Sequence, residues 1–209
     1  MDPALAPDKL LAAYAIGIFP MADEEGELFW LAPDPRAIIE LQAFKPTRSL
    51  RSLLKRGVFQ VTVNRAFGDV MEACADRLEG TWISQDIHDA YCDLHGHGFA
   101  HSVETWQQGS LVGGLYGVSI GGAFFGESMF HRVSDASKVA FAHLVERMVD
   151  RGLVLLDVQF LTAHLTTLGA VEIPRSDYER RLAGAIRLAR SFADPPEPSE
   201  GDASRRGDE

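Results

Sequence analysis

The sequence is poor in cysteine and contains no long apolar run. Its 209 residues include only Cys74 and Cys92, too few for a framework of disulfide bonds. No stretch approaches the roughly 18 apolar residues that a membrane-spanning helix needs, and the chain does not open with a charged segment followed by an apolar one. These absences argue against a membrane protein and a secreted disulfide scaffold, so a cytoplasmic location is expected.

Common cofactor and nucleophile motifs are also missing. The five glycines between residues 113 and 122 form neither a G-x-G-x-x-G nor a Walker pattern, and they suit turns or the close approach of another backbone or a ligand. No Ser-His-Asp order and no nucleophilic cysteine motif occurs. His88, Cys92 and His95 have the i, i+4, i+7 spacing of metal ligands. Apolar residues on the opposite face favour a solvated histidine face instead, so no metal is expected.

Charge is distributed unevenly along a chain whose net charge is −10. An acidic average argues weakly against nucleic acid as a partner. Residues 34–65, however, contain seven basic residues and only two acids, which indicates a locally basic lobe. Residues 194–209 contain six acids, two arginines and no large apolar side chain, which is typical of a disordered tail.

A single carboxylate, Glu127, interrupts the apolar segment AFFGESMF at residues 123–130. If this segment is a strand, alternation places Phe125, Glu127 and Met129 on one face. Because burial of an unpaired charge is costly, Glu127 then needs a cationic or hydrogen-bonded partner. A ligand with an ammonium group and an apolar side chain, such as a hydrophobic amino acid, suits that face. The alternative is an edge-strand glutamate that points to water.

The segment LLDVQF at residues 155–160 predicts a second, mostly buried strand. Period two puts Asp157 and Gln159 on the same face near its carboxyl end. A buried aspartate beside an amide suits a structural role in a loop. It equally suits the fixing of a polar side chain for catalysis, and the pattern leaves both interpretations open.

Helices are predicted at 8–16, 48–56, 66–77, 84–95 and 136–150, and from Ser176, with strands at 59–63, 100–106, 111–120, 123–130 and 153–160. Thr47, Ser84 and Asp135 are the expected N-caps, and Gly57 is an expected helix end. A run of strands followed by a helix, a strand and a helix indicates an α+β domain with a mixed sheet. Acetyltransferase-type acyltransferases have this shape, although a fold alone does not define a function.

The helix after Thr47 carries the clearest signal for nucleic acid. Arg48, Arg51 and Lys55 lie at i, i+3 and i+7, with Arg56 adjacent, and form a basic stripe that could bind phosphates. A solvated helix face is the equally simple alternative.

Nine segments, in chain order, resemble those of bacterial leucyl/phenylalanyl-tRNA–protein transferases. The chain departs from the family pattern at Met21, Ala32 and Thr167. It is also expected to lack the N-terminal extension that many members carry before the first segment. The segments are AYAIGIFPM (13–21), APDPR (32–36), TWIS (81–84), AHSVETW (100–106), LVGGLYGV (111–118), GESMF (126–130), DASKVA (135–140), LLDVQF (155–160) and HLTTLGAVEIPR (164–175).

The resemblance implies an enzyme that moves Leu or Phe, and Met more weakly, from aminoacyl-tRNA to the α-amine of proteins beginning with Lys or Arg. Proteins with acidic N-termini are the alternative acceptors. Such transfer marks proteins for degradation by the N-degron route. The implied architecture is a small N-terminal lobe (1–36), an acetyltransferase-like (GNAT-like) domain with a mixed sheet (37–193) and an acidic tail (194–209).

The resemblance also implies roles for individual residues. Trp82 resembles the residue on which the 3′-terminal adenosine stacks, and Glu127 resembles the acid at the aminoacyl end. Asp157 and Gln159 resemble the proposed catalytic pair. The family's side-chain pocket is matched by Leu115, Met129, Leu144 and Met148. Its basic cluster for the tRNA acceptor stem is matched by Arg48, Arg51, Lys55 and Arg56.

An aminoacyl ester is already activated, so this chemistry requires no cofactor, metal or covalent intermediate. The enzyme must align an amine with the ester carbonyl, accept a proton and stabilise the developing oxyanion. Two alternatives remain from the sequence. One is a GNAT-type small-molecule N-acyltransferase, although no pyrophosphate-binding segment is evident. The other is a non-catalytic protein that binds aminoacyl-tRNA.

Overall fold

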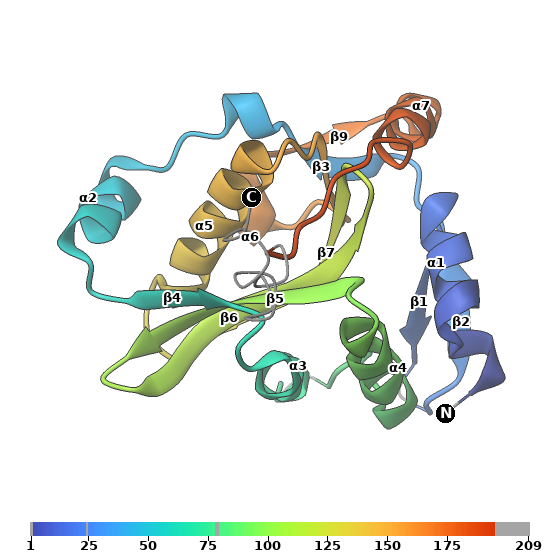
Figure 1. Cartoon of the computed structure of the whole chain (residues 1–209), viewed down its shortest axis with the longest axis horizontal. Coiled ribbons are helices and arrows are strands. Elements are labelled where there is room, and N and C mark those ends of the chain that lie inside the picture. Colours follow the sequence, from blue (N-terminus) through green and yellow to red (C-terminus); the bar gives the residue numbers. More distant parts are fainter. Residues whose placement is uncertain (1, 24, 78–79, 195–209) are drawn as a thin grey trace, which may run out of the picture.

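A seven-stranded mixed sheet forms the centre of the computed structural model, which describes residues 2–23, 25–77 and 80–194 (Figure 1). The elements are η1 (Pro3–Leu5), α1 (Pro7–Ala15), β1 (Phe19–Ala22), β2 (Leu28–Leu31), β3 (Arg36–Ile39), η2 (Leu41–Ala43), α2 (Arg48–Arg56), β4 (Gln60–Val63), α3 (Phe67–Ala75), α4 (Gln85–Gly96), β5 (Ala100–Gln107), β6 (Ser110–Ile120), β7 (Ala123–His131), α5 (Ala136–Asp150), β8 (Leu155–Gln159), α6 (Ala163–Thr167), β9 (Ala170–Ile173) and α7 (Arg175–Ala185).

The strand order is β4-β5-β6-β7-β8-β3-β9, and a separate two-stranded sheet joins β1 and β2. Neighbouring strands are antiparallel except for β7 and β8, which are parallel. The α+β class and the small N-terminal part predicted from the sequence are therefore confirmed. The predicted acidic tail lies outside the described residues, apart from Asp194.

Helix ends follow the local sequence signals at two sites. Thr47 Oγ1 accepts a hydrogen bond from the Leu50 amide at the start of α2, and Gly57 ends that helix with φ 60°. Ser84 caps α4 in the same way. Asp135 precedes α5 as predicted, but its side chain does not cap the helix. Its carboxylate binds Lys138 instead, at 2.7 Å.

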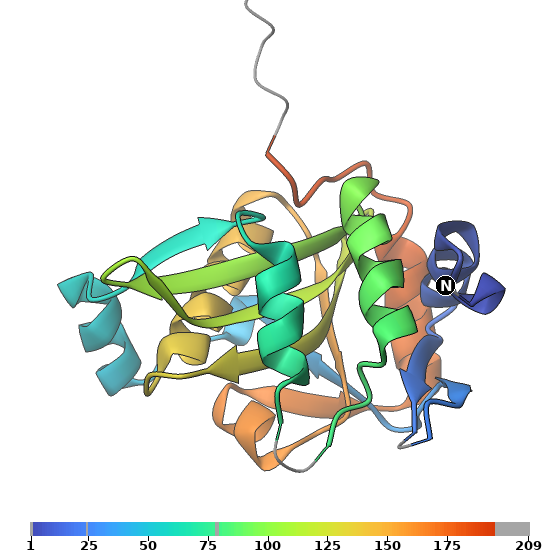
Figure 2. The same ribbon diagram turned by 90° about the horizontal axis from the view of Figure 1, so that it is seen from below.

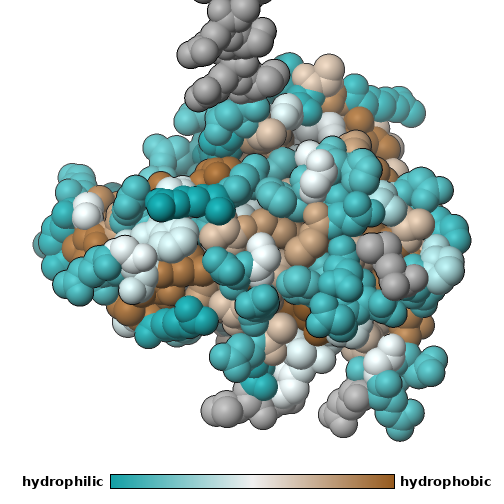
Figure 3. All heavy atoms as spheres, turned by 60° about the horizontal axis from the view of Figure 1, so that its bottom comes forward, coloured by the Kyte–Doolittle hydropathy of each residue, from teal (hydrophilic) through white to brown (hydrophobic). Residues whose placement is uncertain are grey.

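Helices cover both faces of the sheet (Figure 2). Helices α3 and α4 pack on one face, where α1 and α7 contribute to the same apolar core. Helix α5 packs on the opposite face and forms a second core. On the side of α3 and α4, hydrophilic residues predominate at the surface, with apolar side chains between them (Figure 3). Helix α2 packs on α5 through Leu50, Val139 and Ala142.

A β-bulge interrupts the pairing of β6 with β7. Tyr116 pairs with Ser128, whereas the next residue, Gly117, pairs with Gly126, so Glu127 is the extra residue of β7. A bulge of this kind bends the strand and re-aims the side chains beyond it. Side chains before and after the bulge therefore follow different alternations.

The bulge makes the prediction that Phe125, Glu127 and Met129 share one face wrong. Phe125 packs in the core beside α3 and α4, whereas Met129 packs against the core beside α5. The prediction assumed strict period two, which the extra residue breaks.

The parallel strands β7 and β8 pair only over Ala123–Phe125 and Leu155–Asp157. Beyond this point β7 continues to His131, whereas β8 ends at Gln159, whose φ is 57°. The two strands therefore separate on the carboxyl side of their contact, and this opening positions the site described below.

Gly117 is expected to be required for the bulged pairing. An added Cβ would lie 2.2 Å from the Phe125 carbonyl oxygen and 2.5 Å from the Phe124 ring. We expect Gly117→Ala to lower the free energy of unfolding by about 1–3 kcal/mol, as overpacking does. Gly184→Ala in α7 is the control, because nothing lies within 4 Å of its added Cβ. Urea unfolding of both variants is the measurement, and equal midpoints would contradict the assignment.

Candidate active site

A cavity of about 480 Å³ lies where β7 and β8 separate. One part of its wall is apolar, and the other carries hydroxyl, amide and charged groups. The apolar part includes Leu115, Met129, Phe141, Leu144, Leu156, Val158 and Leu165. The polar part includes Arg77, Tyr116, Glu127, Ser128 and Gln159.

The structure brings together four of the five residues predicted to bind substrate. Trp82, Leu115, Met129 and Leu144 line the cavity. Met148 does not, because it lies about 6 Å further along α5 than Leu144 and is fully buried in the core. Phe141, one turn before Leu144, lines the cavity and was missed, although its position on the same helix face was a usable signal.

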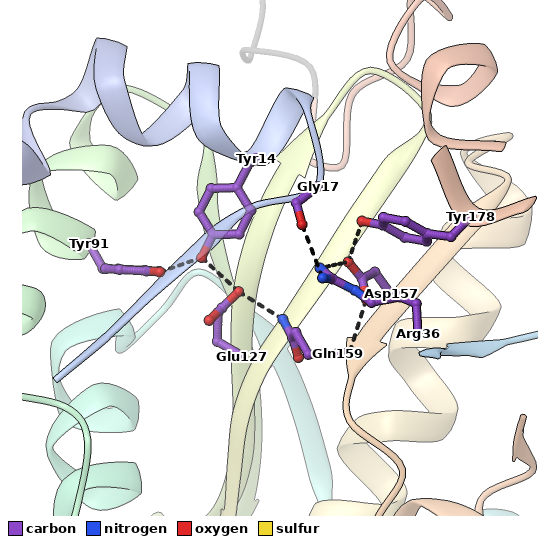
Figure 4. Close-up of polar contacts among 8 residues, drawn as sticks. All are labelled: Tyr14, Gly17, Arg36, Tyr91, Glu127, Asp157, Gln159 and Tyr178. Carbon is purple, nitrogen blue, oxygen red and sulfur yellow. Dashed lines mark hydrogen bonds and ion pairs between the residues drawn. The ribbon is translucent and has the colours of Figure 1, made fainter. Parts of the chain in front are cut away.

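Glu127 is half-buried at the cavity wall and is held by two hydrogen bonds (Figure 4). The Tyr14 hydroxyl donates to its Oε1 at 2.8 Å, and Gln159 Nε2 donates to the same oxygen at 3.1 Å. The Tyr14 hydroxyl also contacts the Tyr91 hydroxyl. The expectation of a hydrogen-bonded partner for this carboxylate is confirmed, and the partners come from α1 and β8.

Removal from water raises the pKa of Glu127 to about 8. The hydrogen bond from Tyr14 opposes this effect, the negative charge of Asp157 adds to it, and the positive charge of Arg36 opposes it. A carboxyl group with such a pKa exchanges its proton near neutral pH. Groups of this kind are common at functional sites.

Asp157 is fully buried and accepts four hydrogen bonds. Its Oδ1 accepts from Arg36 Nε at 2.9 Å and from the Gln159 amide at 2.9 Å. Its Oδ2 accepts from Arg36 Nη2 at 2.6 Å and from the Tyr178 hydroxyl at 2.6 Å. Because these contacts occupy both oxygens and Asp157 is not among the cavity-lining residues, its carboxylate does not face a ligand there.

The Arg36 guanidinium is equally enclosed. Its Nη1 donates to the Gly17 carbonyl at 3.0 Å. The group lies between two aromatic rings, 4.8 Å from the centroid of Phe19 and 4.6 Å from that of Tyr178. The pair with Asp157 therefore connects β1, β3, β8 and α7.

The predicted adjacency of Asp157 and Gln159 takes an unexpected form. Asp157 binds the backbone amide of Gln159, whereas the side-chain amide of Gln159 extends to Glu127. The carboxylate that orients the Gln159 side chain is therefore Glu127. A catalytic role for any of the three stays a prediction.

Sequence reasoning missed Tyr14, Arg36, Tyr91 and Tyr178. Of these, Arg36 could most easily have been found from the sequence, because it begins the otherwise apolar segment RAII. Its burial next to three apolar residues indicates a need for a buried anion. Tyr14 gave no such signal, since 113 residues separate it from Glu127.

The four predicted tRNA-binding residues are exposed on α2. None has an ion-pair partner in the part of the chain that the structure describes. A groove of about 360 Å³ lies beside the start of α2 and is lined in part by Lys45, Thr47 and Lys138. Lys138 belongs to the first turn of α5, where Ser137 lines the main cavity. Lys45, and Lys138 paired with Asp135, therefore lie between the start of α2 and the first turn of α5.

Two negative findings apply to the described residues. No group of three or more His, Cys, Asp or Glu side chains there could hold a metal ion. None of the helices within those residues is long and apolar enough to cross a membrane.

By its fold and cavity, the protein is an α+β domain suited to a ligand that is apolar at one end and polar at the other. The family model described as leucyl/phenylalanyl-tRNA protein transferase matches residues 38–183, and the model of that family's N-terminal domain matches residues 4–34. The chain belongs to the leucyl/phenylalanyl-tRNA–protein transferase family.

Curated relatives match nearly the whole chain. The leucyl/phenylalanyl-tRNA–protein transferase of Ruegeria pomeroyi is 52% identical over 192 residues, covering 91% of each protein. That of Gloeobacter violaceus is 52% identical over 189 residues, covering 90% of this chain and 97% of the relative. That of Herpetosiphon aurantiacus is 49% identical over 193 residues, covering 92% and 100%.

Two solved structures show distant likenesses. L-PGS from Bacillus licheniformis has a TM-score of 0.44 at 13% identity and covers 77% of this chain and 55% of its own. A GCN5-related N-acetyltransferase-like protein from Streptococcus suis has a TM-score of 0.39 at 17% identity, covering 79% and 63%. The sheet itself, rather than these likenesses, defines the fold class.

We expect Arg36→Met to destabilise the protein strongly. Removal of one partner of a buried pair leaves an uncompensated charge and costs about 3–5 kcal/mol. Arg181→Met is the matched control, because Arg181 binds Glu40 at the surface with both side chains more than 40% exposed. Such pairs contribute about 0–1 kcal/mol. Urea unfolding compares the variants, and a similar small loss in both would contradict the role of Arg36.

The Glu127 carboxyl is expected to titrate near pH 8. Carbon NMR of labelled glutamate side chains measures this, with Glu127→Gln identifying the signal. Between its ordinary value of 4.5 and about 8 the folded state holds a proton that the unfolded state has lost. The free energy of unfolding of the wild type should therefore fall relative to Glu127→Gln as pH rises through this range. A midpoint below pH 5 would contradict the burial argument.

Proposed function

We propose that the protein transfers Leu or Phe, and Met more weakly, from aminoacyl-tRNA to the α-amine of proteins that begin with Lys or Arg. Family membership supports the activity. The observation that carries the proposal is the cavity, because an apolar wall and a carboxylate–amide pair lie on its two sides. An aminoacyl ester with an apolar side chain likewise has an apolar end, the side chain, and a polar end, the amine and ester. Transfer of this kind marks acceptors for the N-degron route in the cytoplasm.

The donor side chain would occupy the apolar part, against Leu115, Met129, Phe141 and Leu144. An apolar wall discriminates by size and apolarity, with about 1–3 kcal/mol per methylene group. Leu, Phe and Met are unbranched at Cβ, whereas β-branched Val and Ile are wider near their base. Trp82, which also lines the cavity, would stack on the terminal adenine.

Glu127 is the group best placed to accept the proton of the incoming amine. It lines the cavity, whereas Asp157 is saturated by Arg36, Tyr178 and a backbone amide. Gln159 donates its Nε2 hydrogen to Glu127, which leaves its Oε1 to accept a hydrogen bond from the amine. An approaching ammonium favours the carboxylate form of Glu127, because opposite charges attract.

The proposed step conserves all atoms and protons. The acceptor ammonium first releases one proton to solvent. The neutral amine nitrogen then attacks the ester carbonyl as a second proton passes to the Glu127 carboxylate, and a peptide bond forms. The bond between the carbonyl carbon and the ribose oxygen then breaks, and Glu127 returns the proton to that oxygen. Asp157 and Arg36 act as positioning residues that hold the end of β8.

Arg48, Arg51, Lys55 and Arg56 would bind phosphates of the acceptor stem. Their exposure and lack of ion-pair partners in the described part of the chain support this role. Helix α2 also packs on α5, whose first turn reaches the cavity. A stem bound to α2 would then have its end near the site.

The activity is tested with radiolabelled Leu-tRNA and peptides that begin with Arg, Lys, Glu or Ala. We expect leucine to be transferred to the Arg and Lys peptides. Glu127→Gln should lower the single-turnover rate by about 10²–10⁴-fold, as loss of a general base does, while Leu-tRNA binding changes little. Glu146→Gln on α5 is the control, because that side chain is 68% exposed.

Binding of Leu-tRNA without transfer to any peptide would identify a non-catalytic binding protein and overturn the proposed activity. An unchanged rate in Glu127→Gln would instead assign the proton transfer to another group.

A further inference from the structure

Arg77 is a cation at the cavity that has no carboxylate partner in the described part of the chain. It follows α3, and its guanidinium makes three contacts, all with neutral groups. Nε donates to the Cys74 carbonyl at 3.1 Å. Nη2 donates to Ser128 Oγ at 2.7 Å and approaches the Met129 carbonyl at 3.5 Å.

These contacts orient the Arg77 guanidinium and leave its Nη1 available to bind a further group. A guanidinium has five N–H donors in a fixed plane, and the bonds from Nε and Nη2 attach one edge to α3 and β7. Nη1 has no hydrogen bond to a described residue. Because the side chain is already held, binding of a further group costs little conformational entropy.

No carboxylate among the described residues forms an ion pair with Arg77, although Asp76 precedes it in the chain. Arg175 binds Glu179 and Arg181 binds Glu40 at the surface, whereas the arginines of α2, like Arg77, have no such partner in the described part of the chain. The acids of α3 line a separate hollow with Arg132. Arg77 therefore lies at the cavity with its charge available to an anion.

A second observation places a polar ligand at the same corner. Tyr116 lines the cavity, and its buried hydroxyl has no hydrogen-bond partner among the described residues. Tyr116 pairs across the sheet with Ser128, the residue that Arg77 binds. Buried polar groups are normally satisfied, so a hydroxyl without a partner in a ligand cavity suggests that the ligand supplies one.

Building on the proposed function, we propose that Arg77 binds the phosphate that joins the last two nucleotides of the donor tRNA. The donor side chain lies against Met129, and Arg77 contacts the backbone of that same residue. The terminal ribose, which carries the ester, must then lie at the polar end of the cavity. Its 5′-phosphate is the nearest anion to the ester, and arginine pairs well with phosphate.

A test of coupling separates this role from a structural one. Leu-tRNA is prepared with either the natural terminal phosphodiester or a neutral methylphosphonate at that linkage. For the wild type, the neutral linkage should raise KM about tenfold, the scale of one charge-assisted contact. Arg77→Gln should raise KM equally with the natural donor. The two changes together should cost little more than either alone, because they remove the same interaction.

Arg51→Gln on α2 is the matched control. It should weaken binding of both donors, and its effect should multiply with that of the neutral linkage. Arg77→Lys should restore part of the affinity for the natural donor only, since lysine keeps the charge but not the planar donors.

If the KM increases caused by Arg77→Gln and by the neutral linkage multiply in combination, the assignment is overturned. An unchanged KM in Arg77→Gln would also overturn it. Failure of the proposed function is distinguishable, because the wild type would then transfer nothing from natural Leu-tRNA.

Discussion

The buried ion pair of Arg36 and Asp157 is the interaction on which the rest of the site depends. Burial of two charges costs free energy unless the geometry is good and the remaining hydrogen-bonding groups are satisfied. Here the pair is bidentate, and Tyr178, Gly17 and the Gln159 amide complete it. These contacts join the N-terminal part to β8 and α7. They also fix the end of β8, where Gln159 adopts a positive φ.

The bulge at Glu127 gives the cavity its two different sides. With regular pairing, Glu127 and Met129 would have shared one face of β7, and the carboxylate would have lain among apolar side chains. The extra residue instead leaves Met129 beside α5 and Glu127 within reach of Tyr14 on α1. A ligand in the opening between β7 and β8 thus meets an apolar wall and a polar one.

Local sequence signals predicted much of the fold but few of the hydrogen bonds that connect the site residues. Thr47 and Ser84 were correct caps because an N-cap depends on residues three or four positions away. The strands β5, β6 and β7 followed from alternation and intervening turns. The bulge did not, because it depends on the close approach of Gly117 to the Phe125 backbone. The partners of Asp157 and Glu127 come from distant segments, which no local pattern brings together.

Asp157 and Glu127, two carboxylates close enough to influence each other's charge, lie in different environments. Asp157 has a guanidinium partner and no access to the cavity. Among the described residues, Glu127 has a hydroxyl and an amide as hydrogen-bond donors, and it lines the cavity. Without a cation in direct contact, burial favours its protonated form, so its charge depends on what enters the cavity. In the proposed reaction an ammonium at the cavity would supply the missing cation and so favour the carboxylate form of Glu127, whereas Asp157 already has its counter-ion in Arg36.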